Sequence, residues 1–193
     1  LPGDLDYWRG DLNLPSSTSS NPCAICPVND SDLPWFDFTV NARWLNMIYT
    51  VAGWIARGWN RSPLFTIPGV TVHSLYPDWM HAKHLGTDKV LAGSVLYVML
   101  YCLDLAGDVE ARLARIWEKI LVIYRRDRVE NRFGTLKLTM FTAKASIKLK
   151  GRAMEVRDLI PVLHKVWRSY YNVNLERHRK IEMVLRTSAH LDD

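Results

Sequence analysis

The chain has 193 residues, enough for one hydrophobic core, and 23% of them are charged, which argues against a disordered protein. Three cysteines, two of them close together, argue against a secreted disulfide scaffold and favour a reducing, intracellular compartment. Charge is uneven: residues 112–186 hold 19 Lys and Arg against 7 Asp and Glu (net +12), and the remainder holds 6 against 13 (net −7).

The basic stretch is the first functional clue. Lys and Arg in this proportion attract the phosphate backbone of DNA or another nucleic acid, because binding releases condensed counterions. The same charge also suits neutralisation of the acidic remainder or of an acidic partner subunit. Both interpretations stand at this point.

Residues 1–39 predict an irregular arm. The sequence begins at Leu1 with neither an initiator methionine nor a signal-peptide pattern, so we expect a processed or truncated chain. A serine-rich link follows Pro15, and three further prolines interrupt the rest of the arm. Little regular structure is expected here unless a metal or a partner orders it.

A helical domain is predicted over residues 40–193. Apolar residues recur at helical spacing over residues 40–59, which favours a helix with one aromatic face. The connector over residues 61–72 leads into a short strand expected at residues 70–73. The eight tryptophans predict helices that partner proteins cover, because bulky aromatics bury large areas at interfaces.

The next helix is predicted to begin at Pro77, and Gly86 is expected to break it before another helix over residues 87–105. The longest uncharged run, residues 90–103, is 14 residues long, short of the roughly 20 that cross a bilayer. We therefore expect a buried core helix and no transmembrane segment, with Cys102 in the core.

A third helix is predicted after Asp108, its natural N-cap, with an apolar stripe from Leu113 to Tyr124. A strand is compatible with the loose alternation of residues 135–143. Two last helices are predicted, over residues 151–171 with a kink or interruption at Pro161, and over residues 175–186. The fold class is thus mainly α, an irregular arm followed by a helical domain, with a short β element.

Four residues form a candidate zinc site. Cys23 and Cys26 have the C-x-x-C spacing that places two thiolates at adjacent corners of a zinc tetrahedron. His81 and His84 lie three apart, so on a helix they project from one face and complete a Cys2His2 set for structural zinc. A redox dithiol or ordinary loop cysteines compete for the first pair, and surface histidines for the second.

Two carboxylates and a set of basic residues are further candidates. Asp78 could hold a divalent cation, but a helix N-cap explains it as well. Glu155 could equally pair with a neighbouring arginine on a solvated face. The candidate nucleic-acid contacts, interleaved with aromatic residues, are Arg125, Arg126, Arg128, Arg132, Lys148, Lys150, Arg152 and Arg157.

Two segments resemble a known family. Residues 72–81, which end in Asp-Trp-Met-His, with Lys83, Gly86 and residues 91–96, are similar to the D-x-M-H segment of CACTA and Plavaka-like cut-and-paste DNA transposases. Residues 149–163 resemble the downstream Leu-Lys, acid, Leu-Pro-Val-Leu stretch of those proteins. The upstream C-x-x-C also fits a pattern seen among such elements.

The resemblance implies part of an RNase H-like core that carries a helical insertion and zinc-supported helices. It also implies two-metal phosphodiester chemistry, in which Mg²⁺ would be held by catalytic carboxylates. Asp78 and Glu155 are the positions carried over as catalytic. The family core also needs an earlier Asp on a buried strand, and the irregular arm offers none, so the metal site is incomplete in this chain.

The leading hypothesis is a transposase-derived, zinc-stabilised, nucleic-acid-binding segment in the nucleus. Any enzymatic activity would be metal-dependent phosphodiester transfer. The alternative is a non-catalytic accessory subunit of a large assembly, for instance in an organelle. Its tryptophan-rich helices would pack on protein partners, and its basic half would contact acidic protein, RNA or lipid headgroups.

Overall fold

The computed structural model describes residues 2–3, 5–16, 18–29, 32–37, 39–58, 63–141 and 147–192. Contacts divide the chain into two units, Leu1–Asp78 and Trp79–Asp193. The predicted division after residue 39 differs from this, because residues 40–78 share a core with the N-terminal segment.

The first unit consists of short elements joined by irregular chain. Strands β1 (Pro2–Gly3) and β2 (Tyr76–Pro77) pair in parallel, with Pro2 opposite Tyr76. The helices of this unit are α1 (Leu5–Gly10), η1 (Arg43–Asn46), α2 (Val51–Ala56), η2 (Pro63–Thr66) and η3 (Val72–Ser74).

Trp54 is the centre of the small core of this unit. Its ring is fully buried against Phe65, and its indole N–H donates to the carbonyl of Ala24 at 2.8 Å. Trp8 and Leu12, at and just after α1, belong to the same cluster. The N-terminal segment is therefore tied to residues 49–75 by burial rather than by long elements.

Two expectations for this unit are wrong. The helix predicted over residues 40–59 is broken between η1 and α2, because the Thr50 hydroxyl accepts the Gly53 N–H at 3.1 Å and starts a new helix. The strand predicted at residues 70–73 is instead η3. There the Thr71 N–H donates to the Ser74 hydroxyl at 3.1 Å and closes a turn.

The second unit is built on one continuous helix, Met80–Cys102. It consists of η4 (Met80–Thr87, π-helical), α3 (Asp88–Tyr97) and η5 (Val98–Cys102, π-helical). Gly86 therefore does not break the helix. A Cβ at Gly86 would lie 3.1 Å from the carbonyl oxygen of His81, so the widened turn favours a residue without a side chain.

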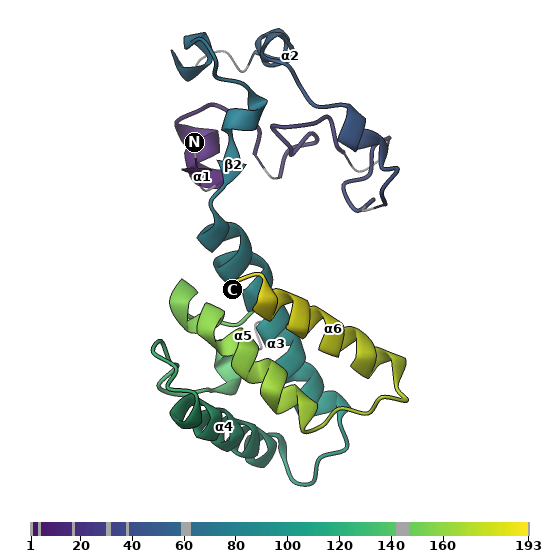
Figure 1. Ribbon diagram of the computed structural model, residues 1–193, viewed down its shortest axis with the longest axis vertical. Helices are drawn as coiled ribbons and strands as arrows, with labels where there is room; N and C mark the ends of the chain where they lie inside the picture. The colour runs from purple at the N-terminus through teal and green to yellow at the C-terminus, as the bar shows by residue number, and fades with distance from the viewer. Residues whose placement is uncertain are drawn as a thin grey trace. The chain divides into compact units, whose positions relative to one another are not determined.

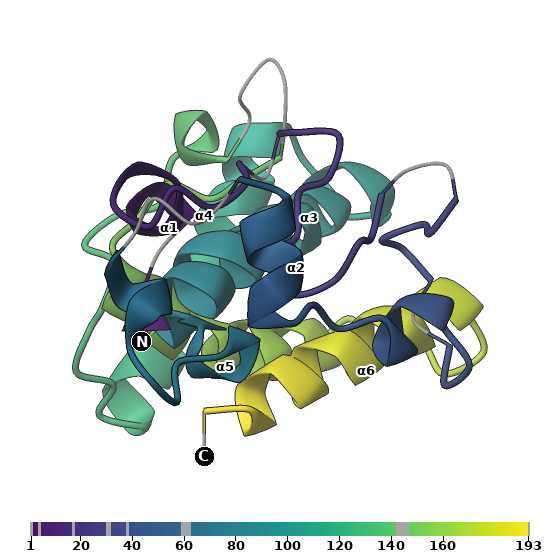
Figure 2. The ribbon, with the colours of Figure 1, turned by 90° about the horizontal axis from the view of Figure 1, so that it is seen from above.

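Three more helices pack on this one. They are α4 (Val109–Arg126), α5 (Ala153–Arg168) and α6 (Glu176–His190), and α5 contacts all the others (Figures 1 and 2). The predicted cap is confirmed, since the Asp108 carboxylate accepts the Ala111 N–H at 2.8 Å. Pro161 lies inside an uninterrupted α5, and the strand expected at residues 135–143 is replaced over its described part by irregular chain and the single turn η6 (Leu138–Met140).

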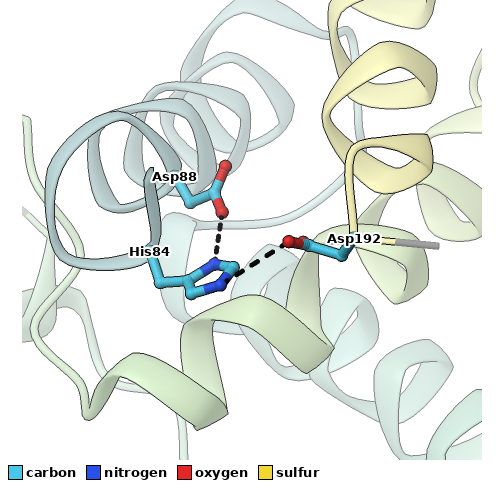
Figure 3. A group of neighbouring side chains, drawn as sticks. All are labelled: His84, Asp88 and Asp192. Atoms are coloured by element: carbon cyan, nitrogen blue, oxygen red, sulfur yellow. Dashed lines mark hydrogen bonds and ion pairs between the residues drawn. The ribbon is translucent and has the colours of Figure 1, made fainter. Parts of the chain in front are cut away.

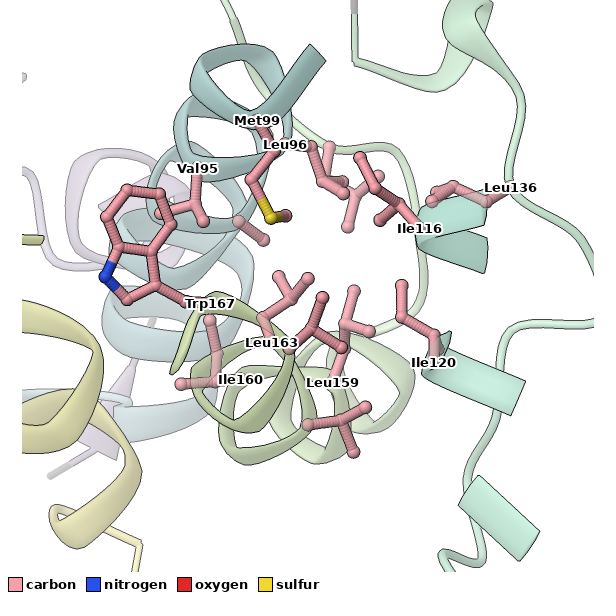
Figure 4. Close-up of a cluster of buried hydrophobic side chains, with 14 of the residues drawn as sticks. Val95, Leu96, Met99, Ile116, Ile120, Leu136, Leu159, Ile160, Leu163 and Trp167 are labelled. Carbon is pink, nitrogen blue, oxygen red and sulfur yellow. The ribbon is translucent and has the colours of Figure 1, made fainter. Parts of the chain in front are cut away.

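The core of this unit lies between the long helix, α4 and α5. Figure 4 shows Leu96 and Met99 facing Ile116 of α4 and Leu163 of α5 across it. Cys102 is exposed, so its predicted core position is wrong; Met99 and Leu100 of the same last turn are buried, while Cys102 lies on the exposed side of the helix.

By length and composition alone, the helix Met80–Cys102 is long and apolar enough to cross a membrane. It also buries Lys83 and Asp88, and its apolar face meets the neighbouring helices. These features favour the predicted core helix. The chain is mainly helical as predicted, and the only strands in the part of it that the structure describes are the two-residue pair β1 and β2.

Candidate functional site

The Cys23–Cys26 pair has the local geometry of a metal-binding knuckle. The two sulfur atoms are 3.6 Å apart, and the Ile25 N–H donates to the Cys23 sulfur at 3.3 Å. A tetrahedral zinc with Zn–S bonds of about 2.3 Å separates its sulfur ligands by about 3.8 Å. The pair therefore fits two corners of a zinc site.

Burial keeps the Cys26 thiol protonated without a metal. Desolvation, partly offset by the Val28 N–H and reinforced by neighbouring Cys23, raises the pKa of Cys26 to about 11. The fold holds the two backbone carbonyls between the cysteines, because Ala24 accepts the Trp54 indole N–H at 2.8 Å and Ile25 accepts the Tyr49 N–H at 2.9 Å. A bound cation would favour the thiolate that burial now disfavours.

The two histidines of the predicted zinc set lie in the other unit. His81 and His84 are both in the π-helical segment η4; His81 is exposed and His84 is buried. The structure therefore holds the thiol half and the imidazole half of the set in separate units, and their joint role stays a prediction.

His84, Asp88 and Asp192 (Figure 3) form a polar cluster with Lys83 and Ser188, and every member except the exposed Asp192 is buried. Asp88 is 1% exposed and accepts hydrogen bonds from the Lys83 ammonium at 2.8 Å and the Ser188 hydroxyl at 2.6 Å. His84 Nδ1 lies 3.1 Å from the same carboxylate, and its Nε2 lies 3.5 Å from Asp192.

Ligand atoms of His84, Asp88 and Asp192 lie within 4.8 Å of one another, the one such group of three among the described residues. The Lys83 ammonium already joins the two carboxylates, at 2.8 Å from Asp88 and 2.6 Å from Asp192. Lysine thus supplies the positive charge that a divalent ion would bring. The cluster is an internal ion-pair network that fastens the end of α6 to η4 and α3.

The two predicted catalytic carboxylates are differently placed. Glu155 belongs to a capping box at the start of α5: it accepts the Arg152 backbone N–H at 2.9 Å and pairs with the Arg152 guanidinium at 2.8 Å. Those bonds to Arg152 hold the pKa of Glu155 below its usual range. Asp78 is half-buried at the end of the first unit, so the two residues lie in separate units.

The predicted nucleic-acid contacts gather mainly in one place, where α4 ends, loop 127–132 turns and α5 begins. Asn131 joins this loop to α5, since its backbone and side chain donate to Asp158 at 3.2 and 2.9 Å. We call the following six residues the basic face: Arg125, Arg126, Arg128, Arg132, Arg152 and Arg157.

Half of the basic face is ion-paired. Arg126 pairs with Asp127 at 2.7 Å, Arg152 with Glu155 at 2.8 Å and Arg157 with Asp158 at 2.7 Å. Hydrogen bonds from Arg126 and Lys165 lower the pKa of Asp127 to about 2, so this carboxylate is charged at neutral pH.

The other half of the face carries free positive charge. Among the described residues, no carboxylate lies within ion-pair distance of Arg125, Arg128 or Arg132. All three side chains are exposed.

Lys148 and Lys150 precede α5, in the chain that runs beside α3. The Leu149 N–H donates to the carbonyl of Lys89 at 2.9 Å. Gly93 permits the approach, because a Cβ there would lie 3.0 Å from the Leu149 nitrogen. Burial and the like charge of Lys148 lower the pKa of Lys89.

Sequence reasoning missed most of the polar cluster. Asp88, Ser188 and Asp192 carry no recognisable spacing, because 104 positions separate the two carboxylates and only the packing of α6 brings them together. Lys83 offered a weak signal, as one of three charged residues, with Asp88 and Lys89, in a helix that ends in a long apolar run.

No protein-family model matches the chain, and neither the curated proteins nor the solved structures contain a match.

Proposed function

We propose that the chain is a transposase-derived, zinc-stabilised segment whose second unit binds the phosphate backbone of nucleic acid through the basic face. The observation that carries this proposal is the gathering of six arginines from α4, loop 127–132 and α5, three of them without an ion-pair partner among the described residues. Arginine forks at such a surface suit phosphate oxygens.

The charge distribution between the units supports the proposal. The second unit holds 21 Lys and Arg against 13 Asp and Glu, net +8, and the first holds 4 against 7, net −3. The positive charge therefore belongs to the helical unit rather than to the chain as a whole. A steep salt dependence of binding is expected from this arrangement.

The transposase resemblance supports this proposal through the order of its motifs along the chain. Its D-x-M-H segment leads into η4, and its Leu-Pro-Val-Leu stretch lies in α5. We propose binding rather than catalysis, because Glu155 already uses both carboxylate oxygens in the capping box of α5. Asp78 and Glu155 are then remnants of a metal site.

Zinc enters the proposal through Cys23 and Cys26. Their sulfur separation and the N–H donors to their sulfur atoms suit thiolate ligands. The histidines His81 and His84 are the proposed remaining donors, and for His84 this role requires that it leave Asp88 and Asp192. Zinc bound there would stabilise the folded chain, because the unfolded chain presents no preformed site. Elemental analysis of wild type beside Cys23→Ser and His81→Ala tests this part alone.

The binding proposal is tested with a fluorescent DNA duplex and two variants of equal charge. One replaces Arg125, Arg126, Arg128 and Arg132 with Gln. The control replaces four basic residues of α6 with Gln, namely Arg177, Arg179, Lys180 and Arg186. The first variant should lose at least tenfold in affinity and the control no more than about threefold. Equal losses would show that net charge, and not the basic face, governs binding.

A second candidate function, an accessory subunit of an assembly, is favoured by one observation. Large apolar side chains of the first unit are exposed between residues 35 and 48, including Trp35 at 54%, Phe36 at 60% and Val40 at 91%. Clusters of this kind mark protein contact surfaces. Sedimentation of wild type and a Trp35→Ser, Phe36→Ser variant would show whether this surface drives association.

A further inference from the structure

The α4–α5 groove is a second surface feature of the helical unit, separate from the basic face. It has a volume of about 600 Å³. Its residues on α4 fall at helical spacing over two turns, and those on α5 face them. The residues that carry the argument are Arg115, Lys119, Val122, Lys165, Val166 and Tyr170.

The floor of the groove is lined by apolar side chains. Val122 is 51% exposed although it lies in the middle of an amphipathic helix, and Val166 of α5 is buried beneath the groove. Leaving a branched apolar side chain half in water forgoes part of its burial free energy. A ligand with an apolar face would recover that contribution.

The rim of the groove is basic. Arg115, Lys119 and Lys165 surround it, and Glu118 is the one acidic residue that lines it. Lys165 also pairs with Asp127 at 2.7 Å, and Lys119 donates to the Ser169 hydroxyl at 3.2 Å. The groove therefore combines an apolar floor with an excess of positive charge at its edges.

The aromatic residue in the groove is unsuited to base stacking. The Lys119 ammonium lies over the Tyr170 ring, 5.1 Å from its centre, and Tyr170 is half-buried. A nucleobase would have to displace this cation before it could stack on the ring. A ligand with an apolar ridge and acidic flanks could bind in the groove without displacing the Lys119 ammonium.

We infer that the α4–α5 groove binds an amphipathic helix of a partner protein, with its apolar ridge on Val122 and Val166 and its acidic residues against Arg115, Lys119 and Lys165. Two parallel walls of helical residues suit a third helix, which packs its ridge between them. The groove and the basic face use different residues, although Asp127 pairs with both Lys165 and Arg126 and so connects the two surfaces.

The test uses the full chain, labelled with nitrogen-15, and a synthetic helical peptide with leucines along one face and glutamates along both edges. Amide chemical shifts should move in α4 and α5 around the groove. Val122→Lys should weaken binding about tenfold and Lys119→Gln about threefold. The matched control is Val173→Lys, an exposed valine of the α5–α6 loop, which should bind as wild type does.

Four results would overturn the inference. One is an absence of groove shifts, and another is equal binding of a peptide with lysines in place of the glutamates. A third is groove shifts caused by single-stranded DNA and not by the peptide, which would assign the groove to nucleic acid. The fourth is shifts that grow with protein concentration alone, which would assign the groove to a second copy of the chain.

Discussion

Replacing Asp88 with Asn tests the polar cluster by removing one charge without changing side-chain volume. Asp88 is 1% exposed and accepts hydrogen bonds from Lys83 and Ser188. The amide cannot match this, because one of its two terminal groups is a donor. Lys83, whose side chain is 5% exposed, would then retain only Asp192 as a counter-charge.

The expected cost follows from this burial. Removing one partner of a buried ion pair destabilises a protein by about 3–5 kcal/mol when the remaining charge is left unpaired; because Lys83 keeps Asp192, we expect the lower end of this range, about 3 kcal/mol. For a helical unit of this size, that loss corresponds to a fall in Tm of roughly 10–20 °C. Urea unfolding followed by circular dichroism would measure it at neutral pH.

Asp108 provides the matched control. Its carboxylate caps α4 at the surface, and Asn is an equally good N-cap, so Asp108→Asn should change the unfolding free energy by less than about 0.5 kcal/mol. An Asp88→Asn protein within about 1 kcal/mol of wild type would refute the reasoning. The Lys83 ammonium would then have to be solvated or neutral in the folded chain.

Further predictions concern Gly93, Cys26 and the ion content of the cluster. Gly93→Ala should cost about 1–3 kcal/mol in urea unfolding, because the new Cβ would meet the Leu149 nitrogen at 3.0 Å; an unchanged midpoint would contradict that close approach. The pKa of Cys26 is raised to about 11 in the folded chain, whereas a cysteine in the unfolded chain has a pKa near 8.5. The protonated thiol therefore contributes its full stabilisation to the fold below pH 8.5, and this contribution is lost as pH rises through 11. Alkylation of Cys26, read by mass spectrometry, should therefore be slow at pH 8 and accelerate up to pH 11, and uniform reactivity across that range would oppose the assignment. Magnesium or EDTA should leave the Tm of zinc-free wild type unchanged, because Lys83 already supplies the cation between the carboxylates.

Local signals made much of the helical unit predictable. Asp108 followed by an apolar stripe defined α4, because an N-cap and a period of 3.6 residues act within one helix. Glu155 was equally local, and the structure gives it the solvated ion pair with Arg152 that was one of its two predicted roles. Such features need no knowledge of the tertiary fold.

The predictions from the sequence were wrong where tertiary packing or a π-helical turn determined the local structure. Gly86 is a helix breaker by propensity, but it lies inside a π-helical segment in which a Cβ would approach the His81 carbonyl oxygen to 3.1 Å. Cys102 lies within an apolar run, yet it is exposed while Met99 and Leu100 of the same turn are buried. In the first unit, Thr50 starts a new helix inside a continuous apolar pattern.

The candidate site also has features that the sequence could predict and features that it could not. The exposed arginines of the basic face could be identified from the sequence, because charged runs rarely enter a core. Their gathering depends on the Asn131–Asp158 contact, which spans 27 positions and was not foreseeable. The polar cluster depends on the docking of α6 against η4, so no local pattern could have indicated it.

Nucleic-acid recognition by the basic face can be measured through the salt dependence of duplex binding. The slope of log K against log salt counts the phosphates neutralised, at about 0.9 per contact. Replacing Arg125, Arg126, Arg128 and Arg132 with Gln should reduce the magnitude of that slope by about 3 to 4, while the α6 variant keeps the wild-type slope. Identical slopes for wild type and the basic-face variant would contradict the account.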